Sequence, residues 1–188
     1  MANHVTEQAE TIPALLFASQ DRSGEDAQVQ WYESGVLQSM SWAESIDSVR
    51  QLAAGLMRLG IKPGDRVAII SETNHVWSAC DLAILCTGAV TVGIYPTSTE
   101  EETAWILADC GARVAFVDTE VRAHALHDQA SDAAPALKHI VVMREADDVH
   151  SEGITTLDDI VDPDRARSPD GRAALDARWQ SVGADDLA

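Results

Sequence analysis

The pattern of hydrophobic and polar positions is clearest after Ser41, where apolar residues recur every three or four positions. This spacing predicts an amphipathic helix, and the pair Ser41 and Glu44 forms a capping box that marks its start. Gly60 ends the helix, and Pro63 prevents it from resuming. The apolar positions of this predicted helix are Ile46, Val49, Leu52, Ala53, Leu56 and Leu59.

Short apolar runs alternate with further helical segments downstream. The runs are rich in β-branched residues and apolar on both faces, which is typical of interior parallel strands. Asn74 and Thr99 are suited to cap the helices that follow the first two runs. We expect strands at residues 66–70, 90–94, 113–117 and 138–143, and helices at residues 74–85, 99–110 and 119–130.

The two ends of the chain add smaller elements. Residues 1–10 are expected to be a flexible start, followed by a short helix that Thr11 caps. Two β-rich runs, Val29–Tyr32 and Val36–Trp42, flank Glu33-Ser34-Gly35 and predict a hairpin. Residues 144–188 are acidic and turn-rich, with short helices expected near residues 156–161 and 168–179.

Alternating strands and helices predict an α/β protein with a doubly wound, mainly parallel sheet and an N-terminal β-hairpin. Residues 11–143 would form this α/β subdomain, and residues 144–188 would be an acidic connecting segment. Ligands of such sheets bind at the carboxyl ends of the strands. The segments to consider are therefore Ser71-Glu72, Tyr95-Pro96-Thr97 and Asp118-Thr119.

Charge and composition narrow the classes of partner. The chain has 188 residues, with 13 Lys and Arg against 31 Asp and Glu, for a formal charge of −18. This balance argues against nucleic acids and anionic membrane surfaces as partners, because phosphate contacts depend on clustered Lys and Arg. Residues 82–95 are too short and too interrupted to span a bilayer. Three cysteines without C-x-x-C spacing suggest reduced thiols and a cytoplasmic protein.

Most of the candidate functional residues have a structural explanation. The sequence contains no G-x-G-x-x-G, Walker or G-x-S-x-G motif. His124 and His127 are interpreted as part of a solvated helix face rather than a metal site, and the glutamates at residues 100–102 as helix-capping charges. Asp65 is interpreted as a turn residue that enters a strand. We therefore assign no catalytic, cofactor-binding or metal-binding residue, and Trp77 and Trp105 are interpreted as core residues first and pocket walls second.

Several ordered blocks of sequence resemble the adenylate-forming enzymes, which include acyl-CoA synthetases, luciferases and peptide-synthetase adenylation domains. The similarity extends from about residue 12 to residue 188 and is most specific for the long-chain fatty-acid–CoA ligase branch. Where that branch often has an Asn-Arg-Pro-Glu-Trp-like run, this chain has Thr73-Asn74-His75-Val76-Trp77, and Gly93 replaces a usual proline. The blocks are Ser41–Glu44, Leu59–Ile69, Asp81–Thr97, Ala104–Leu107 and Gly111–Val117.

The resemblance implies an incomplete N-terminal subdomain of the adenylate-forming fold. The parent enzyme would use ATP and magnesium to convert a fatty acid to acyl-adenylate, and then transfer the acyl group to coenzyme A. In the family, a run like Asp185–Ala188 is followed by a Ser/Thr/Gly-rich phosphate loop. We therefore expect this chain to be inactive alone, to bind none of these cofactors tightly, and to need the remainder of the ligase chain.

Three residues are expected to contribute to a substrate pocket in the parent, namely Trp77, Tyr95 and Thr97. The parent would be cytoplasmic, and peripheral attachment to a membrane stays open. One alternative is a naturally short binding or dimerisation module that self-associates through exposed apolar surface. A receiver-type domain is a weaker alternative, because Lys62 and Lys138 do not lie where receiver chemistry needs a lysine.

Overall fold

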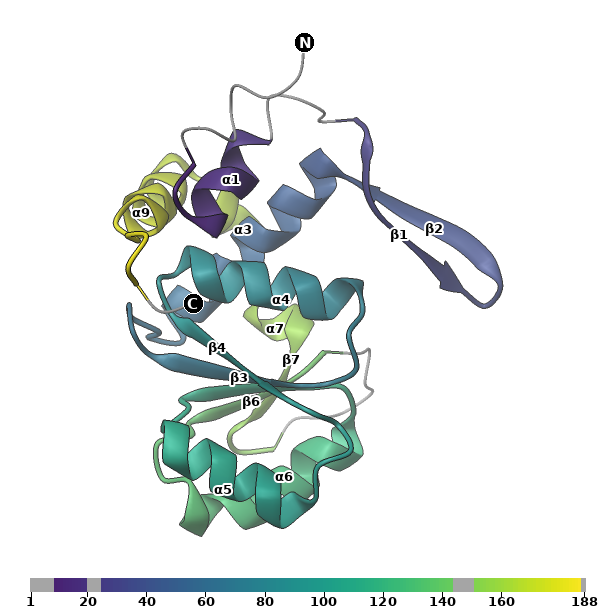
Figure 1. The fold of residues 1–188 in the computed structure, drawn as a ribbon, viewed down its shortest axis with the longest axis vertical. Helices are drawn as coiled ribbons and strands as arrows, with labels where there is room; N and C mark the ends of the chain where they lie inside the picture. Colours follow the sequence, from purple (N-terminus) through teal and green to yellow (C-terminus); the bar gives the residue numbers. More distant parts are fainter. Residues whose placement is uncertain (1–8, 20–24, 144–150, 187–188) are drawn as a thin grey trace.

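The computed structural model describes residues 9–19, 25–143 and 151–186. Within these ranges, one parallel sheet is covered by helices on both faces, and a separate hairpin projects from the body (Figure 1). The strands are β1 (Ala27–Glu33), β2 (Val36–Ser41), β3 (Arg66–Ile70), β4 (Val90–Ile94), β5 (Val114–Val117), β6 (His139–Val142) and β7 (Ile154–Thr156). The helices are α1 (Ile12–Ala18), α3 (Trp42–Arg58), α4 (His75–Cys86), α5 (Glu100–Cys110), α6 (Glu120–Ala133), α7 (Leu157–Ile160), α8 (Pro163–Arg167) and α9 (Pro169–Gln180).

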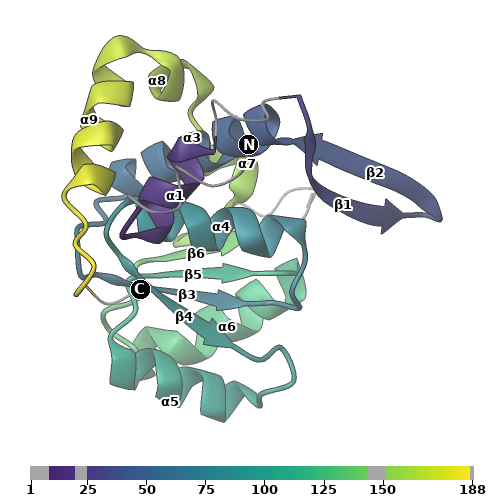
Figure 2. The ribbon, with the colours of Figure 1, turned by 45° about the horizontal axis from the view of Figure 1, so that its top comes forward.

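The five strands of the main sheet lie in the order β4-β3-β5-β6-β7, and every neighbouring pair is parallel. Helices α5 and α6 cover one face of this sheet, while α3 and α4 lie on the other (Figure 2). The predicted doubly wound α/β fold with an N-terminal hairpin is therefore confirmed. The predicted bounds of β3 and β4 match the observed strands residue for residue.

Alternate residues of each strand enter two separate cores, because successive side chains of a strand point to opposite faces. Val67 and Ile69 of β3 pack on the α3 and α4 side, whereas Ala68 and Ile70 pack on the α5 and α6 side. All four residues are fully buried. Burial on both faces explains why the strands are continuous apolar runs rather than alternating patterns.

The hairpin turns at Ser34 and Gly35, which both have positive φ angles, of 49° and 80°. Two consecutive residues in this region match the tight turns that join antiparallel strands, and glycine tolerates the conformation best. The hairpin was predicted, but its second strand ends one residue early. Trp42 is the first residue of α3 and not a strand residue, because the Ser41 side chain caps the helix and fixes its start.

The segment after residue 150 packs against the body more extensively than a connecting segment would need to. The predicted short helices correspond to α7 and α9, which contribute the buried residues Ile160 and Leu175 to the same core as α3 and α4. Strand β7 was not predicted. It has only three residues, so it carries no periodic signal, and its pairing with β6 decides its conformation.

Helices α1, α3 and α9 are joined by one cluster of aromatic and charged side chains. The Arg50 guanidinium lies 4.5 Å from the centre of the Phe17 ring and pairs with the Asp176 carboxylate at 3.2 Å. The Trp179 indole donates a hydrogen bond of 3.0 Å to the same carboxylate, and its ring centroid lies 4.9 Å from that of Phe17. This cluster fixes both chain-terminal helices to the long helix α3.

Candidate functional site

The carboxyl ends of the parallel strands form one edge of the main sheet, and the segments singled out from the sequence lie along it. Ser71 follows β3, Tyr95 follows β4 and Asp118 follows β5. The chain leaves β3 on one side to form β4, and then crosses to form β5 on the other side. A reversal of this kind opens a crevice at the strand ends, where open α/β sheets bind their ligands.

A groove with a volume of about 1020 Å³ opens at this reversal. The strand ends supply one wall, and strand β1 of the hairpin supplies the facing wall. The start of α4 and Met143, which follows β6, complete the lining. The lining residues are Val29, Gln30, Trp31, Tyr32, Glu33, Ser71, Thr73, Asn74, His75, Val76, Ser78, Asp118 and Met143.

A stacked pair of rings connects the hairpin to the body at this groove. The centroids of the Trp31 and His75 rings lie 3.9 Å apart, and the two planes differ by 16°. Burial lowers the pKa of His75 below its usual value, an effect that the Glu33 carboxylate partly opposes. This shift favours the neutral form of the imidazole, which stacks as an uncharged ring at the start of α4.

Three polar side chains along the groove are paired, whereas the buried indole N–H of Trp31 has no partner among the described residues. The buried Ser71 hydroxyl donates to the carbonyl of Glu72 at 3.0 Å, and the Asn74 side chain accepts the backbone N–H of Trp77 at 2.9 Å. Asp118 forms an ion pair of 2.9 Å with Arg122. Groups that are paired in this way orient and enclose a ligand, but they do not form an activated nucleophile with an adjacent base.

The three predicted pocket residues lie apart from the groove. Trp77 packs against the core on the α4 side, and its ring lies 4.0 Å from the position that a Cβ atom on Gly93 would take. Tyr95 is 81% exposed, and Thr97 is exposed in the turn that follows β4. The structure thus brings Ser71 and Asp118 to one groove, and leaves Trp77, Tyr95 and Thr97 outside its lining.

Sequence reasoning missed Trp31 and His75. The hairpin was recognised as an element, but nothing in its sequence indicates that it lies against the start of α4. His75 follows a strand end and the Asn74 cap, so its place near the carboxyl edge could have been found. Its aromatic partner is set by tertiary structure alone.

The thiols are poor candidates for nucleophilic chemistry. Cys80 and Cys86 are buried in the core, and burial raises the pKa of both groups, that of Cys86 to about 12. Because the thiolate is the reactive form, these two side chains are inert at neutral pH. Both belong to the core on the α3 and α4 side of the sheet, where Cys80 Sγ lies 3.9 Å from Met143 Sδ, and this is a structural role.

The remaining clusters of titratable residues also have structural roles. Glu102 closes a capping box on Thr99, and these hydrogen bonds lower the pKa of its carboxyl. His124 lies 3.5 Å from the Glu120 carboxylate on the surface of α6. Across residues 9–19, 25–143 and 151–186, no three His, Cys, Asp or Glu side chains are grouped to hold a metal ion. None of the helices described there is long and apolar enough to cross a bilayer.

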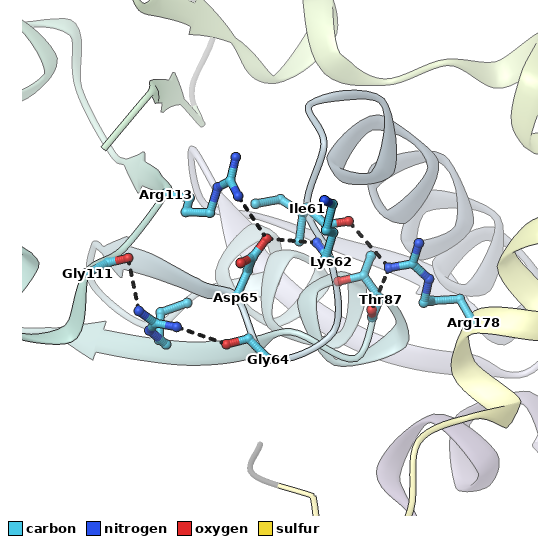
Figure 3. Close-up of polar contacts among 9 residues, drawn as sticks. Ile61, Lys62, Gly64, Asp65, Thr87, Gly111, Arg113 and Arg178 are labelled. Atoms are coloured by element: carbon cyan, nitrogen blue, oxygen red, sulfur yellow. Dashed lines mark hydrogen bonds and ion pairs between the residues drawn. The ribbon is translucent and has the colours of Figure 1, made fainter. Parts of the chain in front are cut away.

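The block around Asp65 lies at the opposite, amino edge of the sheet (Figure 3). The Asp65 carboxylate accepts the backbone N–H of Lys62 at 2.9 Å and lies 3.6 Å from the Arg113 guanidinium. Asp65 is therefore a turn residue at a strand entry, as predicted. Arg66 extends the same network by donating to the carbonyls of Gly64, Cys110 and Gly111.

Arg178 of α9 reaches this edge from the C-terminal segment. Its guanidinium lies at hydrogen-bond distance from the carbonyls of Ile61 and Thr87, at 3.4 and 3.5 Å (Figure 3). These two carbonyls follow the ends of α3 and α4, where unpaired backbone acceptors favour a cation. The sequence block Leu59–Ile69 thus stabilises the fold and lies away from the groove.

Comparisons with known proteins agree with this fold and with the resemblance seen in the sequence. Residues 16–187 match the family described as AMP-binding enzyme. The long-chain-fatty-acid–CoA ligase FadD15 of Mycobacterium bovis is 32% identical over 179 residues, which are 95% of this chain and 28% of that protein. The fold is therefore shared with a family of adenylate-forming enzymes, and this chain belongs to the AMP-binding enzyme family.

Solved structures support the same conclusion at the level of the fold. The anthranilate CoA ligase AuaEII, solved with anthranoyl-AMP, matches with a TM-score of 0.69 and 22% identity, over 84% of this chain and 29% of that chain. A long-chain-fatty-acid CoA ligase described as putative, from Rhodopseudomonas palustris, matches with a TM-score of 0.68 and 19% identity, over 81% of this chain and 36% of that one. The chain spans about 28% of the length of its curated FadD15 relative.

Proposed function

We propose that this chain is the N-terminal part of a fatty-acid–CoA ligase. The enzyme would activate a fatty acid with ATP as acyl-adenylate and then transfer the acyl group to coenzyme A. The observation that carries the proposal is the family match over residues 16–187, together with 32% identity to a long-chain-fatty-acid–CoA ligase across 95% of the chain. A cytoplasmic location stays a prediction from cysteine usage.

The groove at the carboxyl edge is the contribution that this chain makes to such an enzyme. Ser71 and Asp118 on one wall, and Trp31 of the Trp31–His75 stack on the facing wall, would line a substrate site in which polar groups orient the substrate beside the stacked rings. Adenylation develops negative charge on phosphate oxygens, which needs nearby cations or hydrogen-bond donors. The described residues provide no grouped metal ligands and no free lysine at the groove, so we propose that the chain is inactive by itself.

The direct test is to read the gene beyond the codon for Ala188 and to express whatever follows. A frame that continues into a Ser/Thr/Gly-rich loop ending in Lys supports the proposal, and the full chain should release pyrophosphate from ATP when palmitate is present. The 188-residue chain, assayed in parallel, should release none. Turnover of ATP and palmitate by the short chain would refute its proposed inactivity.

Trp77, with Tyr95 and Thr97, remains our proposal for part of the acyl pocket in the full enzyme. Support comes from the place of Trp77 over the exposed Gly93 of β4, which is an edge strand of the described sheet. Trp77→Ala in the full enzyme should change the preference for acyl chain length. Trp105→Ala is the matched control, because Trp105 is 68% exposed on α5 at the opposite face of the sheet, so its interpretation as a core residue was wrong. An unchanged preference in Trp77→Ala would count against the proposal.

A second candidate function is a short binding or dimerisation module. The observation that favours it is the projecting hairpin, on which Tyr32, Val36 and Leu37 are exposed by 76%, 59% and 52%. Apolar surface of this kind promotes association. A stop codon directly after Ala188, together with a dimer that Leu37→Glu dissociates in analytical ultracentrifugation, would establish the module and exclude the ligase.

A further inference from the structure

A second, smaller cavity lies on the opposite face of the main sheet from the groove. It has a volume of about 240 Å³ and opens between the amino-terminal halves of α5 and α6, above the end of β3. Asp118 lines the groove, whereas its ion-pair partner Arg122 lines the cavity, so this pair separates the two spaces. The cavity also contains three hydroxyl side chains, those of Ser98, Thr103 and Thr119.

Thr103 is the most informative of these hydroxyls. Its backbone N–H is paired with the carbonyl of Thr99 at 2.9 Å, and the residue is only 6% exposed. Its hydroxyl lines the cavity, forms no hydrogen bond with the residues that the structure describes, and stays accessible from the cavity rather than sealed in the core. A hydroxyl in this position can donate a hydrogen bond to a molecule in the cavity and accept one from it.

The charged groups around the cavity determine whether a charged or an uncharged ligand fits there. Arg122 is neutralised by Asp118 at 2.9 Å, and Thr119 accepts the backbone N–H of Arg122 at 3.3 Å. Glu100 lines the cavity and accepts the side-chain amide N–H of Gln129, which leaves the amide oxygen of Gln129 as a free acceptor. An anion would meet the Glu100 carboxylate, and a cation would meet the Arg122 guanidinium. Neither charge has a favourable place.

We propose that this cavity is a binding site for an uncharged, polar small molecule or group. The ligand would present both a donor and an acceptor, for the Gln129 amide oxygen and the Thr103 hydroxyl, and a flat apolar part. Ile70 and Leu126 supply the apolar floor. A space of about 240 Å³ holds several waters, or a single small ring with one amide or hydroxyl group.

Three probes of nearly identical shape test the charge selection. Benzamide is neutral, benzoate is an anion and benzamidinium is a cation. We expect saturable changes in the ¹H–¹⁵N spectrum at the backbone amides of Thr103 and Ala125 with benzamide, and at least tenfold weaker affinity for both ions. Equal affinities for the three probes, or no saturable change at these amides with benzamide, would overturn the proposal.

Variants test the role of the hydroxyl. Thr103→Val should weaken benzamide binding by about threefold to tenfold, the usual effect of one lost hydrogen bond. Thr91→Val is the matched control, because the Thr91 hydroxyl likewise has no hydrogen-bond partner among the described residues but lies outside the cavity. Its affinity should equal that of the unchanged protein. Ala125→Leu fills the cavity and should abolish binding, so unchanged affinity in both cavity variants would refute the site.

Discussion

Gly55 lies in the middle of α3, where the backbone of α7 approaches the helix closely. A Cβ atom at this position would lie 2.1 Å from the carbonyl oxygen of Ile160 and 2.9 Å from its carbonyl carbon. Ordinary contacts of a Cβ atom begin near 3.4 Å, so the two helices would have to separate. The side chain of Arg58 donates to the carbonyls of Asp159 and Ile160 at 2.6 and 3.2 Å, and separation would stretch these bonds too.

Gly55→Ala therefore sets two effects of opposite sign against each other. Alanine is favoured over glycine inside a helix by about 0.8–1.0 kcal/mol. Overpacking of a well-packed core costs about 1–3 kcal/mol, and a weakened hydrogen bond costs about 1 kcal/mol more. We expect the free energy of unfolding to fall by about 1–3 kcal/mol, because the contact with backbone atoms cannot be relieved by a side-chain rotation.

Thermal unfolding followed by circular dichroism measures the outcome. For a chain of this size, 1 kcal/mol corresponds to a change in Tm of about 2–4 °C. Ala174→Gly is the matched control, since Ala174 is exposed in α9 and reports helix propensity alone. That variant should lose about 1 kcal/mol. A rise in Tm for Gly55→Ala would show that the higher helix propensity of alanine outweighs any overpacking against α7. The close approach of α7 would then not require glycine at this position.

Three further changes test other parts of the structure. Asp176→Ala removes the partner of Arg50 and of the Trp179 indole, so amide hydrogen exchange in α9 should accelerate. Because the Asp176 side chain is more than a third exposed, the free energy of unfolding should fall by about 1 kcal/mol or less. The folded pKa of His75 lies below its unfolded value of about 6.5, so stability should be full above that pH and fall as the pH drops through the folded pKa. His75→Phe keeps an aromatic ring but cannot titrate. The midpoint of its urea unfolding should therefore depend less on pH, between about 7.5 and about 5.5, than the midpoint of the unchanged protein. An equal dependence would show that the lowered pKa of His75 is not the source of the effect. Thr91→Val should raise the free energy of unfolding in urea titrations by about 1 kcal/mol, because it removes a buried hydroxyl that has no hydrogen-bond partner among the described residues. A loss of stability would show that this hydroxyl is not buried without a partner.

The sequence by itself determined the local elements and the fold class. Helix starts at Ser41 and Thr99 were predictable because each capping box lies within four consecutive residues, and both boxes are present in the structure. Strands β3 and β4 were predictable because burial on both faces requires continuous apolar runs. The sequence blocks also identified the family, which the comparisons confirmed.

Only the tertiary structure decided which distant segments meet. The Trp31–His75 stack joins a hairpin to a helix start, and Gly55 is required by a carbonyl of α7 far along the chain. Strand β7 and the clamp of Arg178 on the ends of α3 and α4 depend in the same way on packing between remote segments. Capping and periodicity act over a few residues and leave a local signature, whereas these contacts exist only after the sheet and its two helical layers have assembled.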